Sequence, residues 1–196
     1  MVSQLIVLEK IRVGFQSLPY PGDQNIVYDN TGNHLECVKI QKELEGKHWS
    51  EVSPETLVRE NSALCFMTPS AFRFYLPAYL SQVVQDFPNS DILPENIMQF
   101  LTLPTEIDTL NKLNFFQQHL SSASLTVHQV LMKQLEESNQ RVHEFIERMV
   151  GLNYQQSQAI RYYLEYLKTE KEDCFLFNEP EIAIYRYWFM FNLDVD

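Results

Sequence analysis

The chain has 196 residues, 45% of them hydrophobic and 13% aromatic, which is enough apolar material to bury a core and excludes intrinsic disorder. It carries 26 acidic and 15 basic residues, a formal net charge of −11, with no cluster of Lys or Arg, so we expect neither nucleic acid nor a membrane surface as a partner. Three widely spaced cysteines and the lack of any apolar stretch of membrane-spanning length predict a cytoplasmic protein with reduced thiols.

Helix-start signals and apolar spacing predict an all-α fold, a single compact multi-helix domain that spans residues 1–196. The expected helices, in chain order, lie near residues 3–16, 34–45, 54–60, 69–87, 92–101, 106–121, 127–150, 154–171 and 179–191. Capping side chains are expected at Asn33, Ser53, Thr68, Thr126, Asn153 and Asn178. We expect Gly46 and Gly151 to adopt the left-handed conformation that often ends a helix.

The expected helix near 69–87 begins with a capping hydroxyl and a proline, Thr68 and Pro69, and contains a second proline, Pro77. Pro77 has no N–H to donate to the carbonyl of Arg73, and its ring crowds that carbonyl, so the helix is predicted to kink or to restart there. The kink would either serve packing alone or open a polar pocket near Arg73 and Tyr75.

The expected C-terminal helix, 179–191, is apolar nearly all round and is interrupted only by Arg186. A helix without a polar face is normally buried, so we expect it in the core of the monomer, with a homodimer contact through Tyr185 or Phe189 as the alternative. Just before it, Phe177 is expected to pack on Ile182 as a hydrophobic staple.

The sequence contains none of the common catalytic or nucleotide-binding motifs, which disfavours an enzyme. His143 and Glu147 lie four residues apart, as two metal ligands on a helix can, but a zinc site needs at least three protein ligands. We therefore interpret them as an ordinary surface pair and expect no metal site and no cofactor.

One stretch is distinctive as a string, because residues 64–80 read LCFMTPSAFRFYLPAYL. Together with Phe15, residues 19–23 and the Gly46-Lys47-x-Trp49 segment, it resembles an uncharacterised bacterial family, a domain of unknown function with the signature LTPxAFRYYLPAYL. Residues 158–167 and 183–188 are also similar to that family, whereas 88–150 match poorly. The resemblance thus covers 8–87 and 154–188, and it implies a family but no activity.

Arg73 is the one cation within this apolar stretch, so its charge must be paired or reach solvent. Asp23, in the proline–glycine turn, is its expected partner, and the pair would pin the 17–33 loop. In the functional alternative, Arg73 binds an acidic group of a ligand or partner. The candidate ligand-binding or partner-binding residues are Asp23, Trp49, Arg73, Tyr75 and Tyr79.

Two classes of function are compatible with these features. The first is an acidic cytoplasmic protein-binding protein, an adaptor or an immunity-type protein, whose partner is a basic protein. The alternative is an enzyme or small-ligand-binding protein with a polar site near Asp23, Arg73 and Tyr75. A structural subunit of a larger assembly is a third possibility, and either a monomer or a homodimer fits the sequence.

Overall fold

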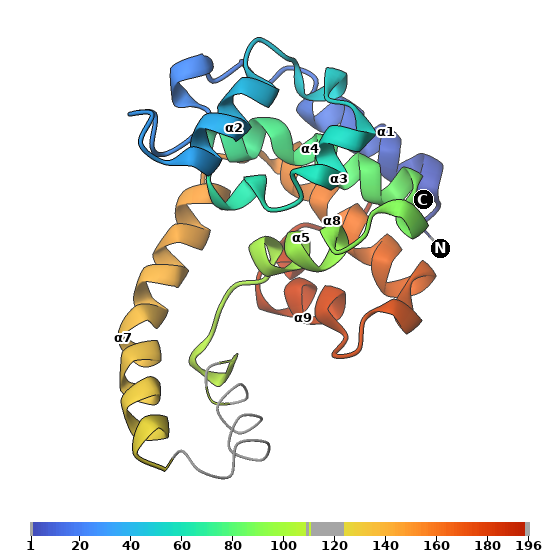
Figure 1. Ribbon diagram of the computed structural model, residues 1–196. Helices are drawn as coiled ribbons and strands as arrows, with labels where there is room; N and C mark the ends of the chain where they lie inside the picture. The colour runs from blue at the N-terminus through green and yellow to red at the C-terminus, as the bar shows by residue number, and fades with distance from the viewer. Residues whose placement is uncertain (1, 109, 111–123, 195–196) are drawn as a thin grey trace. The chain divides into compact units, whose positions relative to one another are not determined.

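The computed structural model describes residues 2–108, 110 and 124–194, which form two compact units (Figure 1). The first unit holds residues 1–102 and 148–196, and the second holds 103–147. Whether the whole of 1–196 acts as the single domain expected from the sequence stays a prediction.

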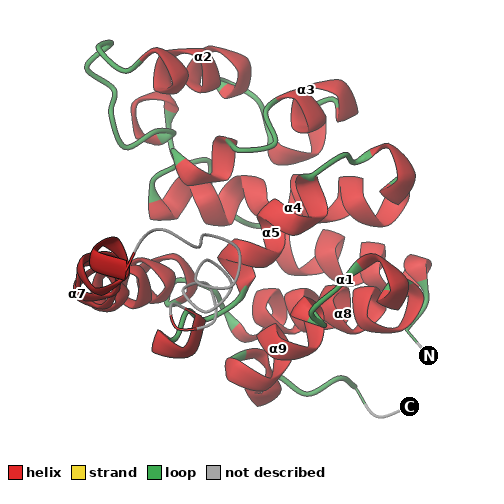
Figure 2. Cartoon of the chain, turned by 60° about the horizontal axis from the view of Figure 1, so that its bottom comes forward, coloured by secondary structure: helices red, strands yellow, loops and turns green. Residues whose placement is uncertain are grey.

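The prediction of an all-α fold is confirmed, and Figure 2 shows helices and loops throughout the described part of the chain. The α-helices with described bounds are α1 (Gln4–Phe15), α2 (Leu35–Leu44), α3 (Pro54–Arg59), α4 (Pro69–Gln85), α5 (Leu93–Leu101), α7 (Ser124–Met149), α8 (Tyr154–Glu170) and α9 (Glu179–Arg186). Short 3-10 turns occur at Asp23–Asn25, Trp49–Glu51, Ala63–Cys65, Phe87–Asn89, Glu172–Cys174 and Trp188–Met190. The extended backbone among the described residues amounts to one antiparallel bridge, Val27 to Met67.

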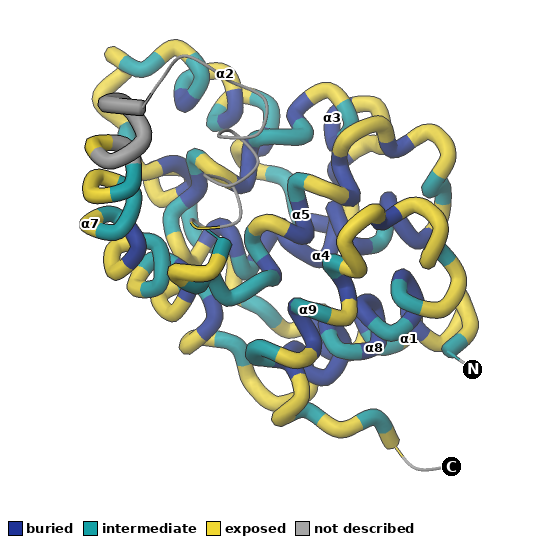
Figure 3. The backbone as a smooth tube through the Cα atoms, turned by 90° about the horizontal axis from the view of Figure 1, so that it is seen from below, coloured by how far each residue is buried: buried dark blue, intermediate teal, exposed yellow. Residues whose placement is uncertain are grey.

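The core of the first unit is built around α4 and α8. Helix α1 packs on both of them, α3 and α5 pack on α4, and α9 packs on α8 (Figures 1 and 3). Helix α4 is buried over most of its length, and its fully buried side chains include Phe72, Tyr75, Leu76, Tyr79, Leu80 and Val83. Pro77 lies inside α4, which runs without a break from Pro69 to Gln85, so the helix does not restart there.

Helix caps that depend on neighbouring residues alone are placed as predicted. The side chains of Ser53 and Thr68 accept from the backbone N–H three residues on, and Asn153 forms a complete capping box with Gln156. Asn33 is not the cap of α2, because the neighbouring His34 accepts from the N–H of Cys37 instead. Thr126 lies inside α7 and therefore does not start it.

The cap and staple predicted at the start of α9 are both wrong. Asn178 has the left-handed conformation, with φ +54°, and its side chain makes no capping hydrogen bond. Phe177 is 74% exposed and so cannot be packed as a staple.

The prediction that the whole C-terminal helix lies in the core of the monomer is also wrong, whereas the alternative, a homodimer contact through Tyr185 or Phe189, stays a prediction. The helix ends at Arg186, and a 3-10 turn, Trp188–Met190, follows. Ala183, Ile184 and Trp188 face inward, whereas Tyr185 is 81% exposed. The break at Tyr187 turns Trp188 into the core, where its Nε1 donates to the carbonyl of Leu101 at 2.7 Å. The segment therefore has a solvent-exposed face, which the prediction of one continuous apolar helix over 179–191 did not include.

The second unit contains most of α7, whose exposed face carries helix-surface pairs. His143 Nδ1 lies 3.4 Å from Glu147 Oε1, which confirms the interpretation of these residues as a surface pair. Lys133 and Glu137 form another pair of the same spacing. The helix expected near 106–121 falls mostly outside the described residues. Within the described part of the chain, no helix has the length and apolarity needed to cross a bilayer.

Candidate functional site

The predicted site residues of α4 separate because of helix geometry. Residues two positions apart on an α-helix point to nearly opposite sides, so Arg73 and Tyr75 cannot line the same site. Tyr75 is fully buried, whereas Arg73 is partly exposed.

Asp23 and Tyr75 lie in one cluster around the turn that follows α2. The Tyr75 hydroxyl donates to the carbonyl of Leu44 at 2.8 Å. Tyr20 donates its hydroxyl hydrogen to Asp23 Oδ1, and both oxygens accept from the backbone N–H of Gly46, at 2.8 Å and 3.0 Å. Gly46 has φ +68°, the left-handed conformation predicted for it. These bonds join the loop near residue 23 and the turn at Gly46 to α4.

Burial sets the protonation state of this cluster. It raises the pKa of the Tyr75 hydroxyl and, together with the bond to Asp23, that of Tyr20. Both phenols therefore stay protonated and act as donors near neutral pH. Because the donors are directed at the chain's own carbonyls and carboxylate, the cluster acts as a structural lock.

Trp49 and Tyr79 are likewise part of the packed interior. Trp49 is 7% exposed, lies beside His48 with ring centroids 5.3 Å apart, and has a buried Nε1 without a hydrogen-bond partner. Tyr79 is fully buried, and its hydroxyl donates to the carbonyl of Glu60 at 3.2 Å. Neither side chain is open to a partner.

Arg73 does not pair with Asp23, so that prediction is wrong. The described ion pairs do not join these two residues, and Arg73 Nη1 donates instead to the carbonyl of Arg148 at 3.1 Å. The guanidinium passes directly over Gly151, where a Cβ would lie 2.5 Å from its Cζ. Burial lowers the pKa of Arg73. Gly151 therefore makes room for a cation, and it has no positive φ, contrary to the left-handed conformation expected for it.

A buried carboxylate, which the sequence analysis did not single out, connects α2 and α3. Glu60 has a side chain that is 2% exposed and accepts from Lys39 Nζ at 2.9 Å and from Arg59 Nε at 2.8 Å. Arg59 Nη2 also lies 2.9 Å from Glu43 Oε1. Burial raises the pKa of Glu60, but the hydrogen bonds from the two cations outweigh it, so the pKa is lowered. The Glu60 carboxylate is thus ionised, and the adjacent Lys39 and Arg59 compensate its negative charge.

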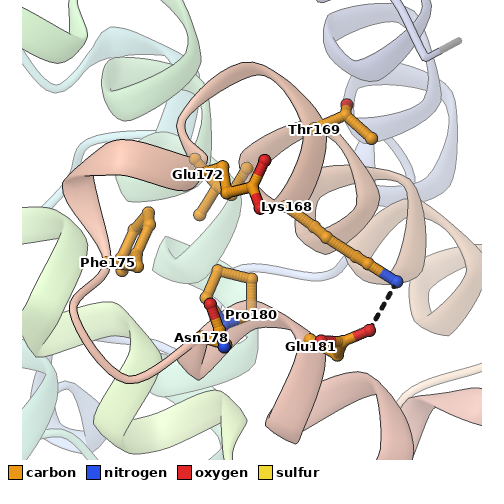
Figure 4. A pocket seen from close by; sticks show the side chains of 8 residues that line it. Lys168, Thr169, Glu172, Phe175, Asn178, Pro180 and Glu181 are labelled. Carbon is orange, nitrogen blue, oxygen red and sulfur yellow. Dashed lines mark ion pairs between the residues drawn. The ribbon is translucent and has the colours of Figure 1, made fainter.

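A pocket of about 290 Å³ lies where α8 ends and α9 begins (Figure 4). It is lined by Leu167, Lys168, Thr169, Glu172, Phe175, Asn178, Pro180 and Glu181. Lys168 Nζ contacts Glu181 Oε1 at 2.9 Å, and this hydrogen bond raises the pKa of the lysine. These residues carry no motif, which is why sequence patterns did not reveal the pocket. No group of three or more His, Cys, Asp or Glu side chains in the described ranges could hold a metal ion.

Part of the chain is similar to a known protein family. Residues 24–119 match the model of a family described as a family of unknown function (DUF6714), which confirms the expected kind of family. The match contains the 64–80 stretch, extends over 88–119, where we expected little similarity, and leaves out 154–188. No curated protein and no solved structure is significantly similar to the chain. Residues 24–119, just under half of the chain, are therefore similar to a family whose function is unknown.

Proposed function

We propose that this is a cytoplasmic, acidic protein-binding protein, of the adaptor or immunity type, whose partner presents a basic surface. The observation that carries the proposal is that many of the chain's basic side chains pair with its own carboxylates. Acidic residues exceed basic ones by 11, and many of the basic side chains already face a carboxylate. The cations in such pairs are Lys10, Arg12, Lys39, Arg59, Lys133, Arg161 and Lys168.

This pairing leaves the excess of negative charge at the surface. Glu60 is the one carboxylate among the described residues that is buried, so the remaining described acids are at least partly exposed to solvent. A surface field of one sign attracts partners of the opposite sign and speeds their association. It also repels the phosphates of nucleic acids.

The geometry gives less support to an enzyme at the predicted polar site. Asp23 and Tyr75 bond to the chain itself, and Arg73 lies on the opposite side of α4. A site for a small polar ligand would need these three groups to converge, which the helix prevents. We therefore prefer the protein-binding function.

The test is to capture a partner with the full chain at low and at high salt, and then to measure association with the purified pair. We expect a stoichiometric basic protein whose association rate falls at least about tenfold as the Debye length shortens from about 10 Å at 0.1 M to about 3 Å at 1 M. An association rate that does not depend on salt would contradict the proposal. So would the absence of any basic partner.

A further inference from the structure

The loop between α8 and α9 presents two large apolar side chains to solvent. The backbone N–H of Asn178 donates to the carbonyl of Phe175 at 3.3 Å and closes a four-residue turn. Its two central residues are Leu176, 87% exposed, and Phe177, 74% exposed. Gly, Pro, Asn, Asp and Ser normally occupy such positions because they suit the turn itself. Local structure therefore does not account for Leu and Phe at this tip.

Packing of Phe175 and local hydrogen bonds hold the turn in place. Phe175 is 5% exposed and packs edge-on against Phe87, with ring centroids 6.4 Å apart. The N–H of Phe175 donates to the carbonyl of Glu172 at 3.2 Å. Within the turn, the N–H of Phe177 donates to Glu179 Oε2 at 3.2 Å. A loop that is ordered before binding loses little conformational entropy when it docks.

Acidic side chains flank the tip on both sides in the sequence. Glu170, Glu172 and Asp173 are exposed before it, Glu179 and Glu181 follow it, and Figure 4 shows Glu172 and Glu181 at the adjoining pocket. The two lysines nearby are both engaged, Lys168 with Glu181 and Lys171 over the ring of Phe87. Residues 168–181 thus contain five acidic and two basic side chains, and the segment that presents the apolar tip has a net charge of −3.

We infer that Leu176 and Phe177 are the docking element for a basic protein that offers an apolar cleft bordered by Lys or Arg. This inference rests on the proposed function and names the surface that performs it. Charge complementarity selects this occupant, because the same acids would repel an anionic membrane and a second copy of this tip. The apolar pair would supply affinity, and the acids would supply steering and orientation.

The first test uses a peptide probe of known chemistry. A basic amphipathic peptide of Lys and Leu is titrated into the full chain, and a Lys and Ser peptide of equal charge serves as its polar reference. Replacing Leu176→Ser together with Phe177→Ser should weaken binding of the Lys–Leu peptide at least about tenfold without changing the melting temperature. The matched control is Leu35→Ser, which removes a side chain that is 84% exposed at the start of α2 and should leave binding unchanged.

Several results would overturn the inference. These are equal affinity of the double variant and the control, a lack of binding of the Lys–Leu peptide, equal binding of zwitterionic lipid vesicles, and a dimer that the double variant dissociates. Partner capture then separates the two proposals. A basic partner that the double variant still retains refutes the docking element and leaves the proposed function standing. A wild-type chain that captures no basic partner refutes the proposed function and the inference with it.

Discussion

The close approach of Arg73 to Gly151 predicts a coupled pair of mutations. A Cβ at position 151 would lie 2.5 Å from Cζ, 2.6 Å from Nε and 2.9 Å from Nη2 of Arg73, distances that real structures do not tolerate. Gly151→Ala must therefore displace the guanidinium. Since the contacting atoms are the end of a flexible side chain, Arg73 will move and the backbone will stay.

The cost follows from what the displaced side chain loses. Arg73 Nη1 donates to the carbonyl of Arg148 at 3.1 Å, and a hydrogen bond to a charged group contributes about 1.5–3 kcal/mol. Against this, replacing glycine with alanine at a position without positive φ stabilises by about 0.4–1 kcal/mol through the unfolded state. We expect Gly151→Ala to lower the free energy of unfolding by about 1–2 kcal/mol.

A double-mutant cycle in urea measures this coupling directly. In an Arg73→Ala background the clash is gone, so Gly151→Ala should be neutral or stabilising by up to about 1 kcal/mol. The free energies of unfolding of the four proteins should then be non-additive by more than about 1 kcal/mol. Additivity within about 0.5 kcal/mol would show that Arg73 does not occupy the space over Gly151.

Three further predictions concern the buried network and the C-terminal segment. In chemical denaturation, Glu60→Gln should lower the free energy of unfolding by only about 1–2 kcal/mol, because Lys39 and Arg59 are about half exposed and can be hydrated instead. Replacing both cations by Met should lower it by about 3–5 kcal/mol, because the buried carboxylate then has no cation to compensate its charge. Because the pKa of Glu60 is lowered on folding, its ionised form stabilises the fold above its unfolded pKa, about 4.3, and this stabilisation is lost as the pH falls through the folded value, so wild type and Glu60→Gln should converge in acid. Trp188→Ala should lower the free energy of unfolding by about 3–5 kcal/mol, whereas Tyr185→Ser should change it by less than about 0.5 kcal/mol, since one side chain is fully buried and the other 81% exposed; similar thermal shifts for the two would refute this view of the segment.

The features that the sequence predicted well depend on a few neighbouring residues. Ser53, Thr68 and Asn153 cap helices because each finds its N–H partner three residues away. Where a distant contact competes, the same reasoning failed. Gly151 satisfies a helix-end pattern, yet its role is to admit a side chain from α4, 78 positions earlier in the chain.

The candidate site shows a different limit. The expected pair of Arg73 and Asp23 rested on charge and on shared motifs, and neither property contains spatial information. The helical repeat does carry spatial information, since residues two positions apart, such as Arg73 and Tyr75, lie on opposite sides of α4. One group that Arg73 bonds to, the carbonyl of Arg148, belongs to the backbone, and the residue types in the sequence give no indication of such a contact.

Composition also misjudged the C-terminal segment, because an apolar residue in the sequence is not marked as inward or outward. Tyr185 and Trp188 belong to the same aromatic run, but the helix break at Tyr187 separates an exposed ring from a buried one. The exposure of Leu176 and Phe177 was not predicted for the same reason, since Phe177 fitted the pattern of a hydrophobic staple. Exposed apolar residues are visible only once the fold has assigned the inner face to others.

The location of the distinctive 64–80 stretch explains why the similarity of residues 24–119 to a known family does not indicate an activity. From 71 to 80 every residue is buried except Arg73, which is partly exposed and bonds to a backbone carbonyl. A signature made of core side chains reports how α4 packs, and many unrelated functions can use one packing arrangement. The tip formed by Leu176 and Phe177 lies outside residues 24–119, the range that matches the family. Similarity to the family over residues 24–119 therefore does not require a shared partner, and the docking element that we infer at the tip would be a feature of this chain outside that range.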